Sequence, residues 1–421
     1  MQMNIEWKIL MNNFKIPKIR FMNFNDKWKY KILGEISNSI EYGLNASAKD
    51  FDGIHKYLRI TDIDDSSRLF LTDKLSSPDV NFTEEDYENY KLQINDLLFA
   101  RTGASVGKTY LYRESDGEVY YAGFLIRARL HDSYDGNFIF QQTLTDKYKQ
   151  FIEITSQRSG QPGVNGKEYG DWKIGMTSYP EQSAIGSLFR TLDDLLASYK
   201  ENLANYQSLK ATMLSKMFPK AGQAVPEIRL DGFEGEWKVK EFGDVVEFYS
   251  GLTYKPSDVV SSGTLVLRSS NVRDGELIYK DNVFVNPDIV NCQHVKFGDI
   301  VVVVRNGSRD LIGKHALIKS EMPNTVIGAF MTGVKSDRPE FVNALLDTKV
   351  FVSEINKNLG STINQITTGN FKRMKFSFPT KEEQQAIGTY FSNLDNLITA
   401  HQEKISKLET LKKKLLQDMF I

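Results

Sequence analysis

The chain has 421 residues, of which 41% are hydrophobic, a formal net charge of −1 and a single cysteine, Cys292. This length suffices for two or three domains, and the lone cysteine excludes a disulfide framework within the chain. The near-neutral charge gives no overall sign of a nucleic-acid partner, and without a signal peptide or a membrane-length apolar run we expect a cytoplasmic protein.

The sequence contains an internal repeat, whose two copies begin at residues 17 and 226. Residues 17–36 match residues 226–245 without a gap at eight of twenty positions, and Trp28 aligns with Trp237. Further matches follow in the same order: Gly43-Leu44 with Gly251-Leu252, Arg101-Thr-Gly103 with Arg305-Asn-Gly307, and Ala184-Ile-Gly186 with Ala386-Ile-Gly388. So many ordered matches indicate an internal duplication. We expect both tryptophans to be buried in the cores of the two copies.

Each copy begins with a module of mixed structure. Residues 17–180 and 226–379 combine short apolar runs with Gly, Asn, Asp and Ser. Leu97–Ala100 and Ile300–Val304 are continuous apolar runs of the length typical of buried strands. We therefore predict two globular modules that are rich in strands and loops.

Each copy ends in a segment with helical periodicity. Residues 181–218 and 382–419 contain no proline and no glycine beyond Gly186 and Gly388. Apolar positions alternately three and four residues apart predict a coiled-coil seam. The predicted seam or partner-interface residues are Leu188, Leu192, Leu195, Tyr199, Asn202, Tyr206 and Leu209 in the first helix, and Leu394, Ile398, His401, Ile405, Leu408, either Leu411 or Lys412, and Leu415 in the second.

Helices of about 36 residues would form rods of roughly 54 Å. We expect the two rods to pack on each other, and they run antiparallel if a two-fold axis relates the two copies. Asn202 and His401 either fix the register of the seam or lie partly exposed at its surface. The predicted fold class is α+β: two mixed α/β modules separated by two long helices that form an antiparallel coiled coil, with a pseudo-two-fold internal repeat.

Motifs for catalysis are absent or incomplete. Gly103–Thr109 resembles a phosphate-binding loop, but three residues separate its glycines where that loop needs four. The second copy has five, and His315 replaces the metal-binding hydroxyl. The chain has no Pro-Pro pair, no metal-ligand spacing of His or Cys, and no Ser/His/Asp set. We predict a non-catalytic chain without a metal site; a nucleotide-binding enzyme using Gly103–Thr109 is the less favoured alternative.

Basic side chains recur beside glycine and asparagine at matched positions of the two modules. An arginine next to a glycine turn can reach a guanine edge with two hydrogen bonds or hold a phosphate. Singly, each is an ordinary solvated charge; as a recurring set they favour nucleic-acid binding. The candidate DNA-binding residues are Arg59, Arg101, Thr102, Lys108, Arg127, Arg158, Arg268, Arg305, Asn306, Arg309, Lys314 and Arg373.

Four motifs occur twice in the same order and together span nearly the whole chain. They are Ile-Arg followed by Trp-Lys at 19–29 and 228–238, Leu-Arg at 58–64 and 267–275, a loop ending in Gly-Lys at 95–108 and 298–314, and Glu-Gln-x-x-Ile-Gly before each helix, at 180–186 and 379–388. This ordered set resembles the specificity (S) subunit of Type I restriction–modification systems, the HsdS family.

The resemblance implies a specific division of labour. Residues 1–180 and 221–380 would be target recognition domains, each reading one half of a bipartite DNA site. Residues 181–220 and 381–421 would be conserved spacer helices that set the distance between the half-sites and dock two methyltransferase (M) subunits. Restriction (R) subunits would complete the complex, and S-adenosylmethionine, ATP and Mg would be bound by partner subunits and not by this chain. An inactive or decoy S-like assembly protein is the alternative within the family.

Overall fold

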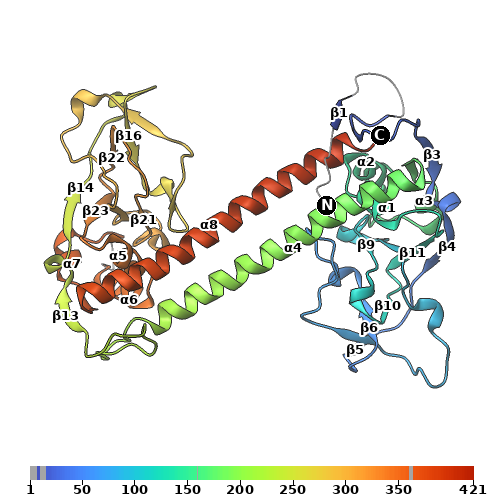
Figure 1. Cartoon of the computed structure of the whole chain (residues 1–421), viewed down its shortest axis with the longest axis horizontal. Coiled ribbons are helices and arrows are strands. Elements are labelled where there is room, and N and C mark those ends of the chain that lie inside the picture. Colours follow the sequence, from blue (N-terminus) through green and yellow to red (C-terminus); the bar gives the residue numbers. More distant parts are fainter. Residues whose placement is uncertain (1–6, 10–15, 159, 360–363) are drawn as a thin grey trace. The chain divides into compact units, whose positions relative to one another are not determined.

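The computed structural model describes residues 7–9, 16–158, 160–359 and 364–421. The chain divides into two compact units, and Figure 1 labels many of their elements. Unit 1 combines Met1–Glu201 with Glu403–Ile421, and unit 2 is Asn202–Gln402. Each unit therefore contains one module together with parts of both long helices.

A four-stranded antiparallel sheet forms the centre of unit 1. Its strands lie in the order β4 (Ser37–Tyr42), β11 (Leu125–Leu130), β8 (Asp96–Ala100) and β9 (Thr109–Leu111). All five residues of β8 are buried, so the strand predicted at Leu97–Ala100 is confirmed.

Shorter elements surround this sheet. Four two-stranded ladders pair β1 (Trp7–Ile9) with β2 (Ile19–Phe21), β3 (Lys29–Ile32) with β12 (Lys173–Met176), β5 (Ala48–Asp50) with β7 (Ser76–Pro78), and β6 (Lys56–Leu58) with β10 (Val119–Tyr121). Three short helices follow the last sheet strand: α1 (Gly136–Gln142), α2 (Asp146–Thr155) and α3 (Gly166–Gly170). Asp135 and Thr145 cap the first two of these helices by accepting a backbone N–H.

Unit 2 repeats the same sheet order. Its central strands are β14 (Glu247–Ser250), β23 (Met331–Lys335), β20 (Ile300–Val303) and β21 (His315–Leu317). A second sheet contains β15 (Val259–Val260), β19 (Val283–Val285), β16 (Thr264–Leu267) and β22 (Thr325–Ile327). Every residue of β20 is buried, which confirms the strand predicted at Ile300–Val304.

The remaining elements of unit 2 match unit 1 except for one two-stranded ladder, whose place in unit 1 is taken by the isolated bridge of Ile63 with Phe70. They are the ladders of β13 (Lys238–Glu241) with β24 (Lys375–Phe378) and of β17 (Val272–Arg273) with β18 (Glu276–Leu277), and the helices α5 (Pro339–Leu346), α6 (Lys349–Asn358) and α7 (Thr368–Arg373). The parallel pairing of β16 with β22 corresponds to that of β6 with β10. The matching order of elements agrees with the duplication inferred from the sequence.

Both predicted tryptophan anchors are buried. Trp28 is 0% exposed and packs against Phe138 and Phe420, with ring centroids 5.4 and 6.2 Å away. Trp237 is 3% exposed and packs against Phe218 at 5.9 Å. Phe420 and Phe218 follow the C-terminal ends of the two long helices. A Met-Phe pair at each helix end therefore completes the core of a unit.

Matched buried ion pairs fix where the long helices begin. The Arg20 guanidinium donates to both carboxylate oxygens of Glu181, at 2.5 and 2.7 Å, and Glu181 is 0% exposed. Arg229 and Glu383 repeat the arrangement at 2.8 and 2.7 Å. Because an unpaired buried charge is strongly destabilising, each arginine must stay with its glutamate. The repeated Ile-Arg and Glu-Gln motifs thus meet in space.

The two long helices are α4 (Tyr179–Lys216) and α8 (Lys381–Asp418), close to the predicted bounds. In unit 1, Asp193 bonds Lys412 at 2.5 Å, and Lys200 pairs with Glu409 at 2.7 Å. The residue with the higher number on α4, Lys200, pairs with the residue of lower number on α8, Glu409. The two helix segments therefore run antiparallel in this unit.

The helix segments of unit 2 have the same antiparallel register. Lys210 binds Asp395 at 2.7 Å, and the rings of Tyr206 and His401 lie 5.2 Å apart. Lys210 also binds Asp347, at the end of α5, at 2.7 Å. This lysine therefore joins both helices to the module of unit 2.

The seam of α4 is displaced from the prediction at alternate positions. Leu196 is 8% exposed, whereas Leu195 is 41% exposed. Asn202 and Leu209 also lie exposed. The observed inward positions are Leu192, Leu196, Tyr199, Leu203, Tyr206 and Lys210. The hydrophobic periodicity could not show which of the two leucines faces inward, because leucine occupies both position 195 and position 196. The prediction that Leu195, Asn202 and Leu209 lie in the seam is therefore wrong, and Leu188 is only half-buried.

The seam of α8 follows the prediction. Leu394, Ile405, Leu408 and Leu415 are buried, and Ile398 and His401 are half-buried. At the position left open between Leu411 and Lys412, Lys412 turns inward to bind Asp193, and Leu411 is 45% exposed.

Candidate nucleic-acid interface

An arginine follows the end of the central strand in both sheets and lies against an aromatic ring. The Arg101 guanidinium carbon is 5.0 Å from the centroid of Tyr42. The Arg305 guanidinium carbon is 4.9 Å from that of Phe330. Such cation–π contacts restrict the arginine without using its hydrogen-bond donors. Among the described residues, neither guanidinium has a carboxylate within 4.0 Å, so both remain available to an external anion or base.

The polar residues next to these arginines join the loop to a second segment. Thr102 forms an isolated backbone bridge with Gly163, and its hydroxyl lies 3.5 Å from the Pro162 carbonyl. Asn306 donates its amide to the Ser269 hydroxyl at 2.9 Å. The backbone bridge recurs in unit 2, where Arg305 pairs with Gln365, so the two loops share this bridge and differ in their side-chain contacts.

The two matched lysines differ in accessibility. Lys108 is 9% exposed; its ammonium donates to the Ile63 carbonyl at 3.1 Å and pairs with Asp65 at 2.5 Å. The hydrogen bond from Lys108 lowers the pKa of Asp65. Lys314, in contrast, is exposed. Lys108 is therefore bonded internally, while Lys314 faces solvent.

Arg127 is a structural residue in this conformation. It is 2% exposed, donates to the Asn89 carbonyl at 2.7 Å and is bonded to Glu41. Its guanidinium carbon lies 5.2 Å from the centroid of Tyr121. Burial and these partners leave Arg127 no surface for DNA, so we remove it from the candidate set. The sequence pattern could not separate it from exposed arginines because its carboxylate partner is 86 residues away.

Arg59 and Arg268 occupy matched positions at the start of short 3-10 turns. Arg59 makes two hydrogen bonds to Asp62, at 2.8 and 2.9 Å, which raise its pKa. Arg268 donates to the Asp281 carbonyl at 2.5 Å. Both side chains therefore brace their own loops.

Three candidates lie exposed on the loops and short helices. Arg158 binds Glu168 at 2.5 and 2.7 Å, and Arg373 donates to Asn370 at 2.9 Å. Arg309 is exposed and, among the described residues, makes no side-chain hydrogen bond or ion pair. Of these three, Arg309 is the most available to an external partner.

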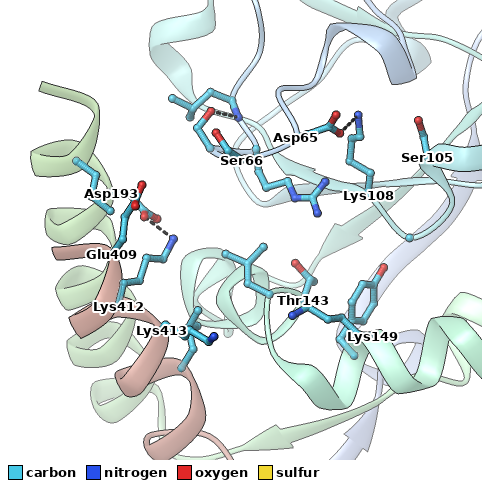
Figure 2. Close-up of a pocket in the computed structure, with 18 of the residues that line it drawn as sticks. Asp65, Ser66, Ser105, Lys108, Thr143, Lys149, Asp193, Glu409, Lys412 and Lys413 are labelled. Carbon is cyan, nitrogen blue, oxygen red and sulfur yellow. Dashed lines mark hydrogen bonds and ion pairs between the residues drawn. The ribbon is translucent and has the colours of Figure 1, made fainter. Parts of the chain in front are cut away.

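A cavity of about 650 Å³ lies in unit 1 beside the predicted phosphate-loop segment. In Figure 2, Asp65 and Lys108 form one wall, and Asp193, Glu409 and Lys412 from the long helices form another. Dashed lines join Lys108 to Asp65 and Lys412 to Asp193. Because these two ammonium groups already have carboxylate partners, neither is free to bind a phosphate in this cavity. Unit 2 has a related cavity of about 470 Å³.

Sequence reasoning missed one exposed aromatic residue in each module. Phe124 is 58% exposed and Phe330 is 50% exposed. Phe124 comes directly before β11, and Phe330 comes directly before β23. Their carbonyls accept hydrogen bonds from the backbone N–H groups of Arg101 and Arg305 respectively. Aligning the repeat through Ala122-Gly-Phe-Leu and Gly328-Ala-Phe-Met would have matched them.

Exposed leucines line one side of the helix pair in each unit. In unit 1 they are Leu195 and Leu411, and in unit 2 they are Leu209 and Leu397, between 37% and 45% exposed. The ion pair of Lys200 with Glu409 lies on the other side of the seam, because its residues follow the seam positions on the opposite helical face. The helix pair of unit 1 therefore has a charged side and an apolar side, and that of unit 2 has the same apolar side.

The part of the chain that the structure describes contains no cluster of three His, Cys, Asp or Glu residues able to hold a metal ion. No helix in these same ranges is long and apolar enough to cross a membrane.

The family model for the Type I restriction modification DNA specificity domain matches residues 234–410. The MjaVIII specificity subunit of a Type I restriction enzyme from Methanocaldococcus jannaschii is 23% identical, with 96% of this chain and 94% of that protein covered. A second protein from this organism, described as the MjaX specificity subunit, is also 23% identical, with 96% and 95% covered. Residues 234–410 therefore match a Type I restriction modification DNA specificity domain, and nearly the whole chain is similar to specificity subunits of Type I restriction enzymes.

The crystal structure of the S subunit of a Type I restriction–modification system from M. genitalium has the same fold. It superposes with a TM-score of 0.67 at 14% identity, covering 96% of this chain and 99% of that one. A specificity subunit recognises DNA sequence and is not itself catalytic. These findings agree with DNA recognition and not with the nucleotide-binding enzyme or decoy alternatives.

Proposed function

We propose that the two modules read the two halves of a bipartite DNA site through the loops that follow β8 and β20. One observation carries the proposal. Arg101 and Arg305 occupy corresponding places on the two matching sheets, each beside an aromatic ring and, among the described residues, without a carboxylate partner. Their neighbouring loops differ, and a common scaffold with different loops suits the reading of two different half-sites. Arg309 and Lys314 extend the basic surface in unit 2.

We further propose that the long helices bind two M subunits through their apolar sides. Leu195 with Leu411, and Leu209 with Leu397, give one leucine pair to each unit. Antiparallel packing places such flanking leucines together on one side of the seam. Two equivalent pairs suit two copies of one partner. Leu188 adds a half-buried leucine to the same side of α4.

The same helices would set the distance between the half-sites. Each has 38 residues, which corresponds to about 57 Å of α-helix, or roughly 17 base pairs at 3.4 Å per pair. Methylation and cleavage would be carried out by M and R subunits, with S-adenosylmethionine, ATP and Mg bound there. A role on cellular DNA would place the complex in the cytoplasm.

The half-site proposal is tested by single arginine variants in the complex with M subunits. Arg101→Ala should relax methylation specificity in one half of the mapped site, and Arg305→Ala in the other. Each good arginine–base pair accounts for about 1–3 kcal/mol of discrimination. Arg113→Ala, an arginine outside the candidate set that pairs with Asp194 at 3.5 Å, is the control and should leave both halves unchanged. A variant that relaxes both halves together would refute separate reading.

The docking proposal is tested by co-purification with the M subunit. Leu195→Asp combined with Leu411→Asp should abolish binding of one M copy, because it places two charges in an apolar contact. Lys200→Ala combined with Glu409→Ala changes the charged side of the same segment and should bind two copies. Equal M stoichiometry in both variants would place the docking surface elsewhere.

A further inference from the structure

The exposed phenylalanine of each module stands at the tip of a tight turn that backbone hydrogen bonds hold on three sides. In unit 1, Leu125 N–H donates to the Ala122 carbonyl at 2.8 Å, closing the turn around Phe124. Gly123 N–H donates to Leu44 at 2.8 Å, and the Phe124 carbonyl accepts from Arg101 N–H at 3.0 Å. The backbone that carries this ring is therefore fixed to both neighbouring segments.

Unit 2 builds the same turn with different residues. Met331 N–H donates to the Gly328 carbonyl at 2.9 Å, and Ala329 N–H donates to Leu252 at 2.9 Å. The Phe330 carbonyl accepts from Arg305 N–H at 3.2 Å. Phenylalanine is kept at the tip although both flanking turn residues differ.

A glycine in each unit allows the turn to approach the preceding strand. A Cβ on Gly43 would lie 2.2 Å from the Ala122 carbonyl oxygen, and one on Gly251 would lie 2.1 Å from that of Gly328. No side chain fits at these distances. Both units therefore use a glycine to hold this turn, whose tip carries an apolar ring that the core does not cover.

Single exposed apolar side chains are common and need no explanation. Here, however, the same ring occurs on the same braced turn in both units, next to the available arginine. A phenyl ring offers no hydrogen-bond group, so it suits the apolar parts of DNA, namely the thymine methyl and the faces of bases. A cation and an apolar ring side by side match a DNA groove, where phosphates and bases lie close together.

We infer that Phe124 and Phe330 are specificity-determining residues that contact the bases of the half-site beside Arg101 and Arg305. The inference rests on the proposed half-site reading and adds the apolar contact to it. The units differ in one respect: Arg305 stacks on Phe330, whereas Arg101 stacks on Tyr42. Loss of Phe330 therefore also frees an arginine, and Phe124 provides the cleaner test.

The test compares binding of the full chain, assembled with M subunits, to a duplex carrying the mapped site and to an unrelated duplex. Phe124→Ala should weaken specific binding by about 10- to 100-fold and change non-specific binding by less than about twofold. The dependence on salt should not change, because no charge is removed. Arg101→Ala, in contrast, should lower the salt slope by about one.

Matched controls lie before β8 and β20, at the opposite end of these strands from Arg101 and Arg305. Ile94 precedes β8 and is 64% exposed, and Phe297 precedes β20 and is 61% exposed. Ile94→Ala and Phe297→Ala should leave the ratio of specific to non-specific binding unchanged. Thermal unfolding of Phe124→Ala and Phe330→Ala within about 2 °C of the parent would show that the turns remain folded.

The outcomes separate the inference from the function on which it rests. A parent complex that binds both duplexes equally refutes half-site reading itself. A specific parent whose ratio survives Phe124→Ala and Phe330→Ala overturns the inference alone. Loss of M subunits from these variants also overturns it, because the rings would then be protein contacts.

Discussion

The carboxylate of Asp96 in unit 1 is neutralised by arginine, whereas that of its counterpart Asp299 in unit 2 accepts a hydrogen bond from tyrosine. Arg129 donates to Asp96 at 2.8 and 2.9 Å, and Asp96 is 0% exposed. Tyr249 donates its hydroxyl to Asp299 at 2.8 Å, and Asp299 is 4% exposed. The aspartate at this matched position therefore has a charged bonding partner in unit 1 and an uncharged one in unit 2.

A coordinated exchange of neighbours accompanies this difference. In unit 1, Glu41 on β4 pairs in register with Arg127 on β11 and binds it. The corresponding strand positions in unit 2 hold Tyr249 and Gly333. The Tyr249 ring lies where a side chain at 333 would be, because a Cβ there would be 2.0 Å from the ring. As the two copies diverged, neighbouring residues that contact one another changed together, while the order of strands in the sheet stayed the same.

The largest expected effect is that of removing the charge of Asp96. Asp96→Asn leaves Arg129 without its carboxylate partner and removes a second negative charge near the buried Arg127, which should lower the free energy of unfolding by about 4 kcal/mol. Asp299→Asn keeps an oxygen acceptor for Tyr249 and should cost about 1 kcal/mol or less. Urea unfolding measures the difference, and hydrogen exchange in β8 and β20 assigns it to a unit. Equal costs would show that the two carboxylates have equivalent environments.

Exchanging the neighbours tests whether they act as a group. Gly333→Arg alone should destabilise unit 2 by about 3 kcal/mol, because the new side chain overlaps the Tyr249 ring. Adding Tyr249→Glu removes the ring and supplies the carboxylate found in unit 1, so at least half of the loss should return. The shift in urea midpoint is the measurement. A double variant as unstable as the sum of the singles would contradict coupling of the pair.

Acid should destabilise unit 2 through Asp347. Burial would raise its pKa, but the His315 imidazole, 3.3 Å away, and the nearby Lys210 lower it to about 2. A lowered folded-state pKa stabilises the protein above the unfolded-state value, and this contribution disappears as pH falls through about 2. The expected loss between pH 5 and pH 2 is about 2 kcal/mol. Asp347→Asn should lack this component in urea unfolding at each pH.

Asp395 supplies the control for this pH dependence. Burial raises its pKa although it shares Lys210 with Asp347, so its protonation in acid does not remove a comparable stabilising charge. Asp395→Asn should therefore retain the acid sensitivity that Asp347→Asn loses. The same acid sensitivity in both variants would assign the effect to other carboxylates.

Features that depend on the local sequence pattern could be predicted from the sequence. Features that depend on contacts between distant residues could not. The buried strands β8 and β20, the tryptophan anchors and the long helices follow from short-range periodicity and the repeat, and these were predicted. The roles of Arg127 and Lys108 depend on Glu41 and Asp65, which are distant in sequence. Exposure of Phe124 depends on a turn that forms only when separate strands meet.

The smallest expected effect concerns the two matched lysines. Lys314→Met removes an exposed charge and should change the free energy of unfolding by no more than about 0.5 kcal/mol. If Lys314 faces a phosphate, DNA affinity should fall uniformly across sequences and the salt slope should drop by about one.

Lys108→Met should have the opposite profile, because its ammonium is bonded to Ile63 and Asp65 inside unit 1. Unfolding should become easier by about 1–2 kcal/mol, with the salt slope of binding unchanged. Fluorescence anisotropy over a salt series, together with urea unfolding, separates the two profiles. A salt slope reduced equally by both variants would mean that Lys108 leaves its internal partners when DNA binds, and the two loops would then be alike in the complex.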